Sequence, residues 1–310
     1  MFKRILALLL ALTMLFAIVA CGTQEPADEE EEQTGDHTGD NGQTGDNGQT
    51  GNEEETPTTL AFSVLSYNTQ NAGTSRGNEP THEAKYQKLA NMISSKTPDI
   101  VSLQECSKDD VANEIRKKMK NKDNYNVIQG ASDAHTAILY NNTVFKRVDY
   151  GCQKIGSAGD ANGSEYDRYM LWAKLRAKET GTEIIVVAIH VDYAEAACLA
   201  QLQTIVNYLK ENQAGVPVIM LGDYNARQSV IDRSAVVSER YSNARSTATA
   251  FQNKNEDTFI GEYSSIIDYI YYKSDVSFRG LKAKYYEVLM DDENNPSDHR
   301  PIYAEFTYGK

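Results

Sequence analysis

The chain has few cysteines, and none of them are spaced for a metal finger or a redox motif. Its four cysteines are Cys21, Cys106, Cys152 and Cys198, and no two of them form a CxxC pair. The three that follow Cys21 are odd in number and widely separated, which excludes a disulfide framework and a zinc site. We predict that these three are small buried apolar residues.

The sequence also lacks an excess of positive charge. It has 31 lysines and arginines against 44 aspartates and glutamates, which gives a formal net charge of −13. Residues 1–58 carry two basic and twelve acidic residues, so −10 of this charge lies there and −3 is left for residues 59–310. The later part therefore has no broad positive field to capture a polyanion, and binding of a nucleic acid would need a local patch or a metal.

Aliphatic residues are nearly absent between Gly22 and Thr58. Acidic runs and an imperfect Thr-Gly-Asp-Asn-Gly-Gln repeat fill this stretch instead. A segment with nothing apolar to bury cannot offset the entropy lost on ordering. Its Asp, Asn and Gly content is also found in calcium loops, but no glutamate closes a twelve-residue frame. Residues 21–58 are therefore predicted to be a disordered, acidic Gly/Asp/Thr-rich tether.

The first apolar run is too short for a stable membrane span. Lys3 and Arg4 precede the run Ile5–Ala20, which ends in Ile-Val-Ala-Cys21-Gly22. This ending resembles a bacterial lipobox. The resemblance implies that residues 1–20 are a lipoprotein signal peptide and that Cys21 is lipidated, which would anchor an extracytoplasmic protein to the membrane. The alternative is an ordinary secretory signal, and either interpretation exports the protein.

Residues 59–310 are predicted to form one domain, because no second linker interrupts them. Short strands dominate, often in hairpin-like pairs, and three segments have helical spacing of apolar residues. This mixture favours two sheets packed face to face with helices outside over a doubly wound parallel sheet. The predicted strands are Thr59–Tyr67, Ile100–Leu103, Tyr125–Ile128, Thr136–Tyr140, Trp172–Ala177, Glu183–Ile189, Val216–Leu221, Ile266–Tyr271 and Pro301–Phe306. The predicted helices contain Tyr86, Leu89 and Ile93; Val111, Ile115 and Met119; and Leu202, Ile205, Val206 and Leu209.

Five of the predicted strands carry acidic, amide or imidazole side chains at or next to one end. The clusters are Leu103-Gln-Glu105, Ile189-His190, Gly222-Asp-Tyr-Asn225, Ile267-Asp-Tyr269 and Ser297-Asp-His-Arg300. One such cluster is common in any α/β protein. Five in one chain predict an active site assembled from the ends of several strands.

The order of these motifs resembles that of the endonuclease/exonuclease/phosphatase superfamily, which includes deoxyribonuclease I-like enzymes, AP endonucleases, neutral sphingomyelinases and inositol polyphosphate 5-phosphatases. The resemblance runs from about Leu60 to Phe306 and covers Asn68, Leu103–Glu105, Ala137–Tyr140, Arg168, His190, Gly222–Asn225, Ile267–Ile270 and Ser297–His299. It implies an α/β (α+β) fold, a four-layer sandwich of two packed mixed β-sheets flanked by helices, which agrees with the strand-rich pattern.

The resemblance implies that a divalent metal, Mg²⁺ with Mn²⁺ or Ca²⁺ as alternatives, works at Asn68, Glu105 and Asp298. Glu105 is a hard oxygen donor of the kind that Mg²⁺ prefers, and its alternative role is that of a surface acid capping a helix. By resemblance, Asn68 helps to place the metal and Asp298 approaches it. The metal would neutralise charge on a phosphate oxygen.

Asp223 and Asn225 lie two residues apart after a buried strand, so in an extended chain their side chains would share one face. Asp223 can accept a proton from an attacking water, and the Asn225 amide can donate to a phosphate oxygen. The alternative is simple turn chemistry, which Gly-Asp and Asn-Ala favour in any protein.

The resemblance pairs His299 with Asp268, and a carboxylate on one ring nitrogen raises the basicity of imidazole and fixes its tautomer. It places His190 on the leaving-group side as a hydrogen-bond donor or general acid, and Arg168 on the phosphate. A structural role for His190 and a surface salt bridge for Arg168 are the alternatives. His135 is a further candidate for lining the pocket, and His82 is expected to be exposed at the start of a helix.

The predicted function is that of an extracytoplasmic, metal-dependent phosphoesterase that hydrolyses P–O bonds by in-line attack of a water activated by the metal and Asp223. A phosphodiesterase or nuclease acting on extracellular DNA or RNA is favoured, with a sphingomyelinase- or phosphatase-like hydrolase as the alternative. The third possibility is a binding module without turnover, which the complete catalytic set argues against. Gln70 and His190 depart from the AP-endonuclease pattern, and this argues against repair of abasic sites.

Two further expectations concern assembly and specificity. A tethered monomer is the simplest state. Substrate choice is expected to be set by loops such as 150–166 and 232–258, whose sequences carry no readable pattern.

Overall fold

The computed structural model describes residues 59–72, 81–106, 110–130, 134–274 and 280–309. The predicted signal peptide (1–20), the lipidation site Cys21 and the tether (21–58) lie outside the described residues. Among the helices in the described ranges, none combines the length and the apolar character that crossing a membrane requires.

Strand β1 (Leu60–Ala72) shows how the sequence specifies the layers. Its side chains alternate, with Phe62 and Val64 packing into a core between the two sheets, and Leu65 and Tyr67 packing against the helices on the other face. Both faces are therefore buried, and the strand lies inside its sheet between β13 and β2 rather than at an edge. It runs past the predicted end at Tyr67, so Asn68 lies within the strand.

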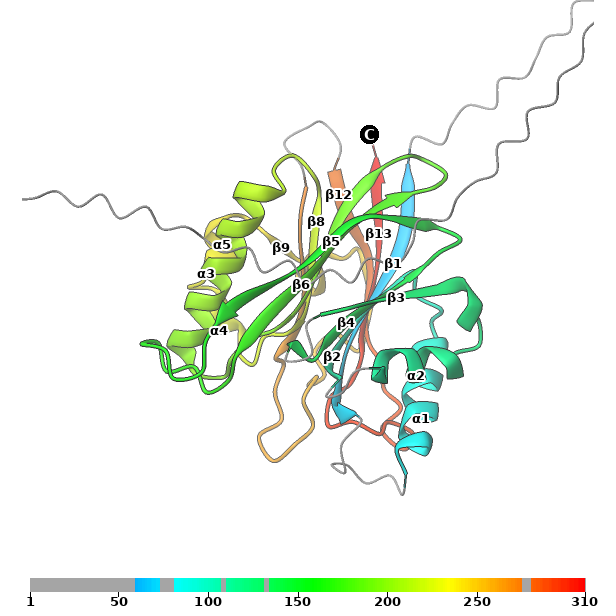
Figure 1. Ribbon diagram of the computed structural model, residues 1–310, viewed down its shortest axis with the longest axis horizontal. Coiled ribbons are helices and arrows are strands. Elements are labelled where there is room, and N and C mark those ends of the chain that lie inside the picture. The colour runs from blue at the N-terminus through cyan, green and yellow to red at the C-terminus, as the bar shows by residue number, and fades with distance from the viewer. Residues whose placement is uncertain (1–58, 73–80, 107–109, 131–133, 275–279, 310) are drawn as a thin grey trace, which may run out of the picture. The chain divides into compact units, whose positions relative to one another are not determined.

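Two mixed sheets form the centre of the fold (Figure 1). The seven-stranded sheet has the order β10-β12-β13-β1-β2-β4-β3, with β1 parallel to β2 and antiparallel to β13. Its other strands are β2 (Ile100–Cys106), β3 (Tyr125–Gln129), β4 (Thr136–Asn141), β10 (Ala250–Gln252), β12 (Gly280–Val288) and β13 (Ile302–Gly309).

The six-stranded sheet has the order β5-β6-β7-β8-β11-β9. Here β7 and β8 run parallel, and β11 is antiparallel to β8. Its strands are β5 (Phe145–Gly156), β6 (Arg168–Ala177), β7 (Glu183–His190), β8 (Val218–Asp223), β9 (Ser242–Asn243) and β11 (Asp268–Lys273).

Helices cover the outer face of each sheet, which completes four layers. The seven-stranded sheet packs on α1 (His82–Ser94) and α2 (Val111–Lys118), and the six-stranded sheet on α3 (Glu195–Asn212). Figure 1 shows α1 and α2 on one side of the strands and α3 to α5 on the other. The predicted four-layer sandwich is confirmed. The short helices are η1 (Lys122–Asn124), α4 (Gln228–Ile231), α5 (Ala235–Ser238) and α6 (Ala244–Thr247).

The predicted strands and helices are present, but several elements were not predicted. Segment 150–166 was expected to be a loop, yet β5 continues into it and ends at Gly156. Segment 232–258, also expected to be a loop, contains α5, β9, α6 and β10. Strand β5 is an edge strand with mostly exposed or half-exposed side chains, so its sequence has none of the apolar alternation that marks a half-buried strand.

The cysteines behave largely as predicted. Cys106 and Cys198 are buried, Cys152 is half-buried, and none of the three forms a disulfide. Burial raises the pKa of the Cys106 and Cys198 thiols to about 12, so both stay protonated at neutral pH.

Gly222 is required where β8 passes β7 just before Asp223. It has φ +156, and a Cβ at this position would lie 2.0 Å from the carbonyl oxygen of Ile189. We expect Gly222→Ala to destabilise the protein by roughly 3 kcal/mol, because both the backbone clash and the unfavourable φ must be accommodated. Urea denaturation measures this free energy of unfolding.

Gly181 supplies the matched control for this prediction. It also has a positive φ, +68, but a Cβ there would meet nothing within 4 Å. Gly181→Ala should therefore cost only about 1 kcal/mol, the conformational penalty alone. Equal destabilisation by the two substitutions would contradict the close contact between β7 and β8.

Candidate active site

The strand ends bring the predicted site residues together from both sheets. In the six-stranded sheet, His190 pairs in register with Asp223, and Asp223 pairs in register with Asp268. These three residues therefore form a row across β7, β8 and β11. In the seven-stranded sheet, Asn68 on β1 lies beside the end of β2, which carries Glu105.

Asn68 hydrogen-bonds a carboxylate from each of the two sheets. Its side chain is fully buried, and its Nδ2 donates to Glu105 Oε1 and to Asp223 Oδ2, each at 3.0 Å. Its Oδ1 accepts from the backbone N–H of Gln70 at 2.9 Å. The amide thus orients two carboxylates, one from each sheet, through its nitrogen.

Glu105 and Asp298 form a pair of acids on one side of this amide. Glu105 is half-buried, and its Oε2 accepts from the backbone N–H of Asn71 at 2.8 Å. Burial raises the pKa of Asp298; the charge of His299 opposes this rise and the charge of Glu105 adds to it. Two carboxylates that repel each other and keep some exposure suit a hard divalent cation that retains waters, so these residues fit the metal that the sequence predicts.

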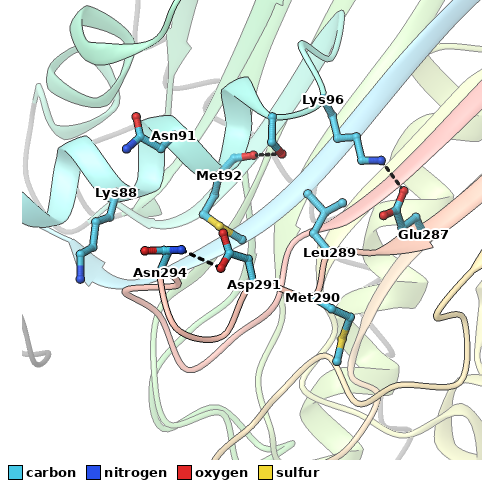
Figure 2. Close-up of a pocket in the computed structure, with 10 residues that line it drawn as sticks. Lys88, Asn91, Met92, Lys96, Glu287, Leu289, Met290, Asp291 and Asn294 are labelled. Atoms are coloured by element: carbon cyan, nitrogen blue, oxygen red, sulfur yellow. Dashed lines mark hydrogen bonds and ion pairs between the residues drawn. The ribbon is translucent and has the colours of Figure 1, made fainter.

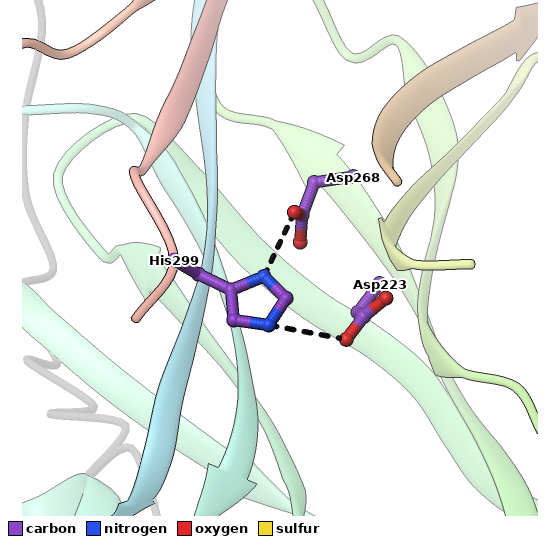
Figure 3. A group of neighbouring side chains, drawn as sticks. All are labelled: Asp223, Asp268 and His299. Carbon is purple, nitrogen blue, oxygen red and sulfur yellow. Dashed lines mark hydrogen bonds and ion pairs between the residues drawn. The ribbon is translucent and has the colours of Figure 1, made fainter. Parts of the chain in front are cut away.

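The second acid cluster is built around His299 (Figure 3). His299 Nδ1 lies 2.9 Å from Asp268 Oδ2, the expected pairing, and His299 Nε2 lies 3.7 Å from Asp223 Oδ2. Burial alone would lower the pKa of His299, but the charges of Asp268 and Asp223 and the hydrogen bond to Asp268 outweigh it and raise the pKa to about 10. The imidazole is therefore a buried cation between two carboxylates.

Asp223 has the most perturbed environment of the carboxylates in this row. Burial and the charge of Asp268 raise the pKa of Asp223 to about 7, while the charge of His299 and the hydrogen bonds from Asn225 and Asn68 oppose the rise. A carboxyl group that titrates near neutral pH is suited to accept a proton from water.

Ligand atoms of Asp223, Asp268 and His299 all lie within 4.8 Å of one another, so this cluster could also hold a metal ion. The chemistry of its donors argues against Mg²⁺ there. Mg²⁺ prefers oxygen ligands, and a ligating imidazole must be neutral, whereas His299 holds its proton up to a pKa of about 10. Glu105 and Asp298 offer only oxygen.

His190 is neutral in this arrangement. Burial lowers the pKa of His190 well below its usual range, and the charges of Arg168, His299 and His135 push it in the same direction. Its Nε2 lies 3.5 Å from Asp223 Oδ2. The sequence leaves two roles open for His190, that of a hydrogen-bond donor and that of a general acid. A neutral imidazole at the end of β7 suits the hydrogen-bond donor. His135 is exposed and near enough to affect His190, and His82 is exposed at the first position of α1.

The geometry expected for Asn225 was wrong. Strand β8 ends at Asp223, and Asn225 has a left-handed backbone with φ +46. The backbone N–H of Asn225 donates to Asp223 Oδ1 at 2.7 Å, so the two residues form a turn instead of sharing one face of an extended strand. The Asn225 Nδ2 donates to the carbonyl of Val191 at 3.0 Å, which holds the side chain beside the end of β7.

Arg168 begins β6, and its guanidinium interacts electrostatically with Asp192, Asp223 and Glu105. The side chain is 13% exposed, and its Nε is buried with no hydrogen-bond partner among the described residues. Burial lowers the pKa of Arg168, while Asp192, Asp223 and Glu105 raise it, and the guanidinium stays cationic at neutral pH. A buried donor without a hydrogen-bond partner fits a phosphate contact.

Several supporting residues escaped the sequence analysis. Fully buried Asp192 lies 3.8 Å from Arg168 Nε, and it follows His190 by two residues. Thr258 Oγ1 accepts from the backbone N–H of Asp268 at 3.1 Å. The ring of Phe259 lies 5.2 Å from that of His299. Of these residues, only Asp192 could have been found from the sequence, because it is an acid just beyond the strand that ends at His190.

The 295–299 segment is fixed by hydroxyl and amide contacts. Ser297 Oγ donates to the backbone carbonyl of Asn68 at 2.7 Å and accepts from the N–H of His299 at 3.1 Å. Asn295 accepts a hydrogen bond from the Tyr67 hydroxyl and donates to the carbonyl of His299. These contacts place Asp298 and His299 against β1.

A pocket of about 450 Å³ lies apart from these groups, between α1 and segment 287–294 (Figure 2). Lys96 Nζ bonds Glu287 Oε2 at 2.6 Å on one side, and Asn294 Nδ2 donates to Asp291 Oδ1 at 2.9 Å on the other. None of the predicted site residues lines it.

The opposite protonation of the two buried histidines leads to a prediction. In protein treated with EDTA, the His299 ring should stay protonated from pH 6 to 8.5 and the His190 ring should stay neutral, which histidine ring NMR distinguishes. The raised pKa of His299 means that its stabilising contribution is complete below about pH 6.5 and is lost as pH rises through about 10.

Asp268→Asn is the informative variant for this titration. Removing that charge should lower the His299 pKa by roughly 2, because the nearer of its two carboxylate partners is neutralised. A His299 that titrates near pH 6.5 in the unsubstituted protein would contradict the buried ion pair.

Comparison with known proteins gives the following relatives. The model of the Endonuclease/Exonuclease/phosphatase family matches residues 65–299. No curated protein matched the sequence. Among solved structures, an endonuclease/exonuclease/phosphatase family protein from Bacteroides thetaiotaomicron is 22% identical with a TM-score of 0.66, covering 80% of this chain and 98% of that one.

Two further structures have the same fold. A mannosyl-6-phosphatase from Bacteroides thetaiotaomicron is 22% identical with a TM-score of 0.66, covering 79% of this chain and 99% of that one. TDP2 from D. rerio, complexed with a single-strand DNA product, is 17% identical with a TM-score of 0.64, covering 79% and 98%. Asn68 bonds a carboxylate from each of the two sheets, and the family model spans most of the chain. This protein belongs to the endonuclease/exonuclease/phosphatase family.

Proposed function

We propose that this protein is a metal-dependent phosphoric ester hydrolase that works outside the cytoplasm. The observation that carries the proposal is the environment of Asp223. Its carboxylate lies 3.5 Å from His190 Nε2 and 3.7 Å from His299 Nε2, and it has a pKa of about 7. One proton acceptor surrounded by a neutral and a cationic imidazole suits hydrolysis of a phosphate ester.

Each residue then has a defined task. Asp223 takes the proton from the attacking water, and Asn68 holds the acceptor oxygen in place. His299, kept protonated by Asp268, donates to an oxygen of the phosphoryl group as negative charge develops there. His190 donates a hydrogen bond on the leaving-group side.

Arg168 and Asn225 bind the phosphate. The Arg168 Nε forms an ion pair with Asp192 at 3.8 Å but has no hydrogen-bond partner among the described residues, so it can donate to a phosphate oxygen. The Asn225 amide nitrogen has two hydrogens; one bonds Val191, and we assign the other to the phosphate. A divalent metal, Mg²⁺ in the first instance with Mn²⁺ or Ca²⁺ as alternatives, would be held by Glu105 and Asp298 and would neutralise charge on the phosphoryl oxygens.

The family includes proteins that act on phosphodiesters and proteins that act on phosphate monoesters, so the class of ester hydrolysed is part of the proposal. The sequence favours a phosphodiesterase or nuclease, and the similar TDP2 structure contains a DNA product. A phosphatase is the second candidate, because the similar Bacteroides enzyme is a mannosyl-6-phosphatase and the loops around this site are acidic. A sphingomyelinase-like lipid hydrolase and a binding module without turnover are the remaining alternatives.

We further propose that Cys21 carries the lipid anchor and that residues 21–58 separate the domain, as a monomer, from the membrane. The lipobox-like ending at Cys21 and the apolar-poor acidic segment after it support this placement. The substrate would then be an extracellular phosphate ester.

The proposed function is tested by hydrolysis of bis-p-nitrophenyl phosphate and p-nitrophenyl phosphate by the full chain in detergent, with Mg²⁺ or with EDTA. Asp223→Asn should lower kcat by about 10³, the range for a lost general base. Glu105→Gln should raise the Mg²⁺ concentration needed for half-maximal activity by at least about tenfold.

Glu211→Gln, an exposed acid on α3, is the matched control and should leave the kinetics unchanged. Cleavage of the diester would support the phosphodiesterase, and cleavage of the monoester alone would support the phosphatase. If a folded, metal-loaded protein turned over neither ester, the binding module would replace the hydrolase.

A further inference from the structure

An exposed tyrosine lies against the arginine that we assign to the phosphate. The Arg168 Cζ is 5.2 Å from the centre of the Tyr166 ring, and Tyr166 is 52% exposed whereas the Arg168 side chain is 13% exposed. The ring therefore lies on the solvent side of the guanidinium. A group attached to a phosphate on Arg168 would lie close to this ring.

Tyr166 is held in place by a buried carboxylate. The Asp192 Oδ2 accepts from Ser164 Oγ at 3.1 Å, from Glu165 N at 3.0 Å and from Tyr166 N at 3.3 Å. Gln201 of α3 adds to this anchor, since its Nε2 donates to Ser164 Oγ at 3.1 Å and its Oε1 accepts from Asp192 N at 2.8 Å. The ring is thus presented by a fixed segment, which lowers the entropy lost when a ligand packs on it.

A second exposed tyrosine stands on the loop to which this segment is bonded. Tyr193 directly follows Asp192 and is 56% exposed. Tyrosine rings combine a large apolar face with a polar tip and two side-chain torsions, and they are well suited to packing against the face of a ring-shaped ligand.

The charge around the site selects against long polyanions. Four of the loops next to the site residues, 157–167, 191–195, 257–267 and 289–299, together contain eleven acidic residues and no lysine or arginine, whereas segment 224–227 after Asp223 adds one exposed base, Arg227. Four of these acids are paired with bases from outside the loops: Asp167 with Lys154, Asp192 with Arg168, Glu195 with Arg233 and Asp292 with Arg300. The remaining acids would repel the flanking phosphates of a polynucleotide, while a single phosphate can reach Arg168.

We propose that Tyr166 forms a subsite for the sugar ring next to the scissile phosphate, and that the substrate is a compact phosphorylated cyclic sugar. This inference rests on the proposed hydrolase. Water adds to phosphorus, the bond from phosphorus to the ester oxygen breaks, and that oxygen leaves with the sugar as a hydroxyl group while inorganic phosphate is released. The sugar can belong to a free monosaccharide or to a nucleoside monophosphate.

The test compares KM and kcat for the full chain in detergent with Mg²⁺. The substrates are a hexose 6-phosphate, a nucleoside 5′-monophosphate, the acyclic glycerol 3-phosphate and a single-stranded oligodeoxynucleotide. Tyr166→Ala should raise KM for the cyclic esters about tenfold with little change in kcat, and should leave glycerol 3-phosphate unaffected. Tyr166→Phe, which keeps the ring, should leave KM for the cyclic esters at the value of the unsubstituted protein.

Phe251→Ala is the matched control. Phe251 is also 52% exposed with a lysine over its ring, Lys254 Nζ at 3.6 Å, but it lies on β10 outside the four loops. It should change neither constant. The better of the two cyclic esters, judged by kcat/KM, identifies the source of the sugar.

Three results would overturn the subsite: no change in KM for cyclic esters, an equal loss for glycerol 3-phosphate, or a higher kcat/KM for the oligonucleotide than for either cyclic ester. If no substrate is turned over, the proposed hydrolase fails instead. Calorimetric binding of the hexose 6-phosphate to the unsubstituted and Tyr166→Ala chains then decides the subsite alone, and equal or absent binding overturns it.

Discussion

The buried amide of Asn68 fixes the active site, because it bonds a carboxylate from each of the two sheets. Glu105 comes from the seven-stranded sheet and Asp223 from the six-stranded sheet, and each accepts a hydrogen bond of 3.0 Å from the same nitrogen. The backbone carbonyl of Asn68 also receives the hydroxyl of Ser297, which in turn holds the His299 N–H. Three segments far apart in sequence thus take their positions from one residue that cannot move without leaving buried polar groups unpaired.

This arrangement separates the acids into two sets with different chemistry. Asp223 and Asp268 are buried on either side of the His299 cation, where low solvation makes charges interact strongly and raises the pKa of Asp223 to about 7. Glu105 and Asp298 are less buried and offer oxygen atoms alone, which suits a hydrated hard cation. Proton transfer and metal binding therefore fall to neighbouring but distinct groups, and the acidic loops with Tyr166 govern which esters approach them.

The sequence could predict what depends on local pattern and on motifs. The two-sided apolar alternation around Val64 and Leu65 indicated a central strand, and the strand-end clusters indicated which segments meet. It could not predict β5, whose exposed side chains have no apolar alternation. At Asn225 the turn, which the sequence offered only as the alternative, is correct, because a hydrogen bond to Asp223 replaces the extended geometry. Asp192 could have been noticed as an acid just beyond the strand end at His190, but its contacts with residues 164–166, about 27 positions away, follow from no spacing rule.

The position of a bound metal ion tests most directly whether proton transfer and metal binding belong to separate groups of residues. We would collect anomalous diffraction from crystals of the protein soaked with Mn²⁺, a Mg²⁺ substitute with a usable anomalous signal. The account predicts a peak beside the carboxylates of Glu105 and Asp298, with the contact between His299 Nδ1 and Asp268 preserved. A peak among Asp223, Asp268 and His299, with His299 turned into a ligand, would contradict it.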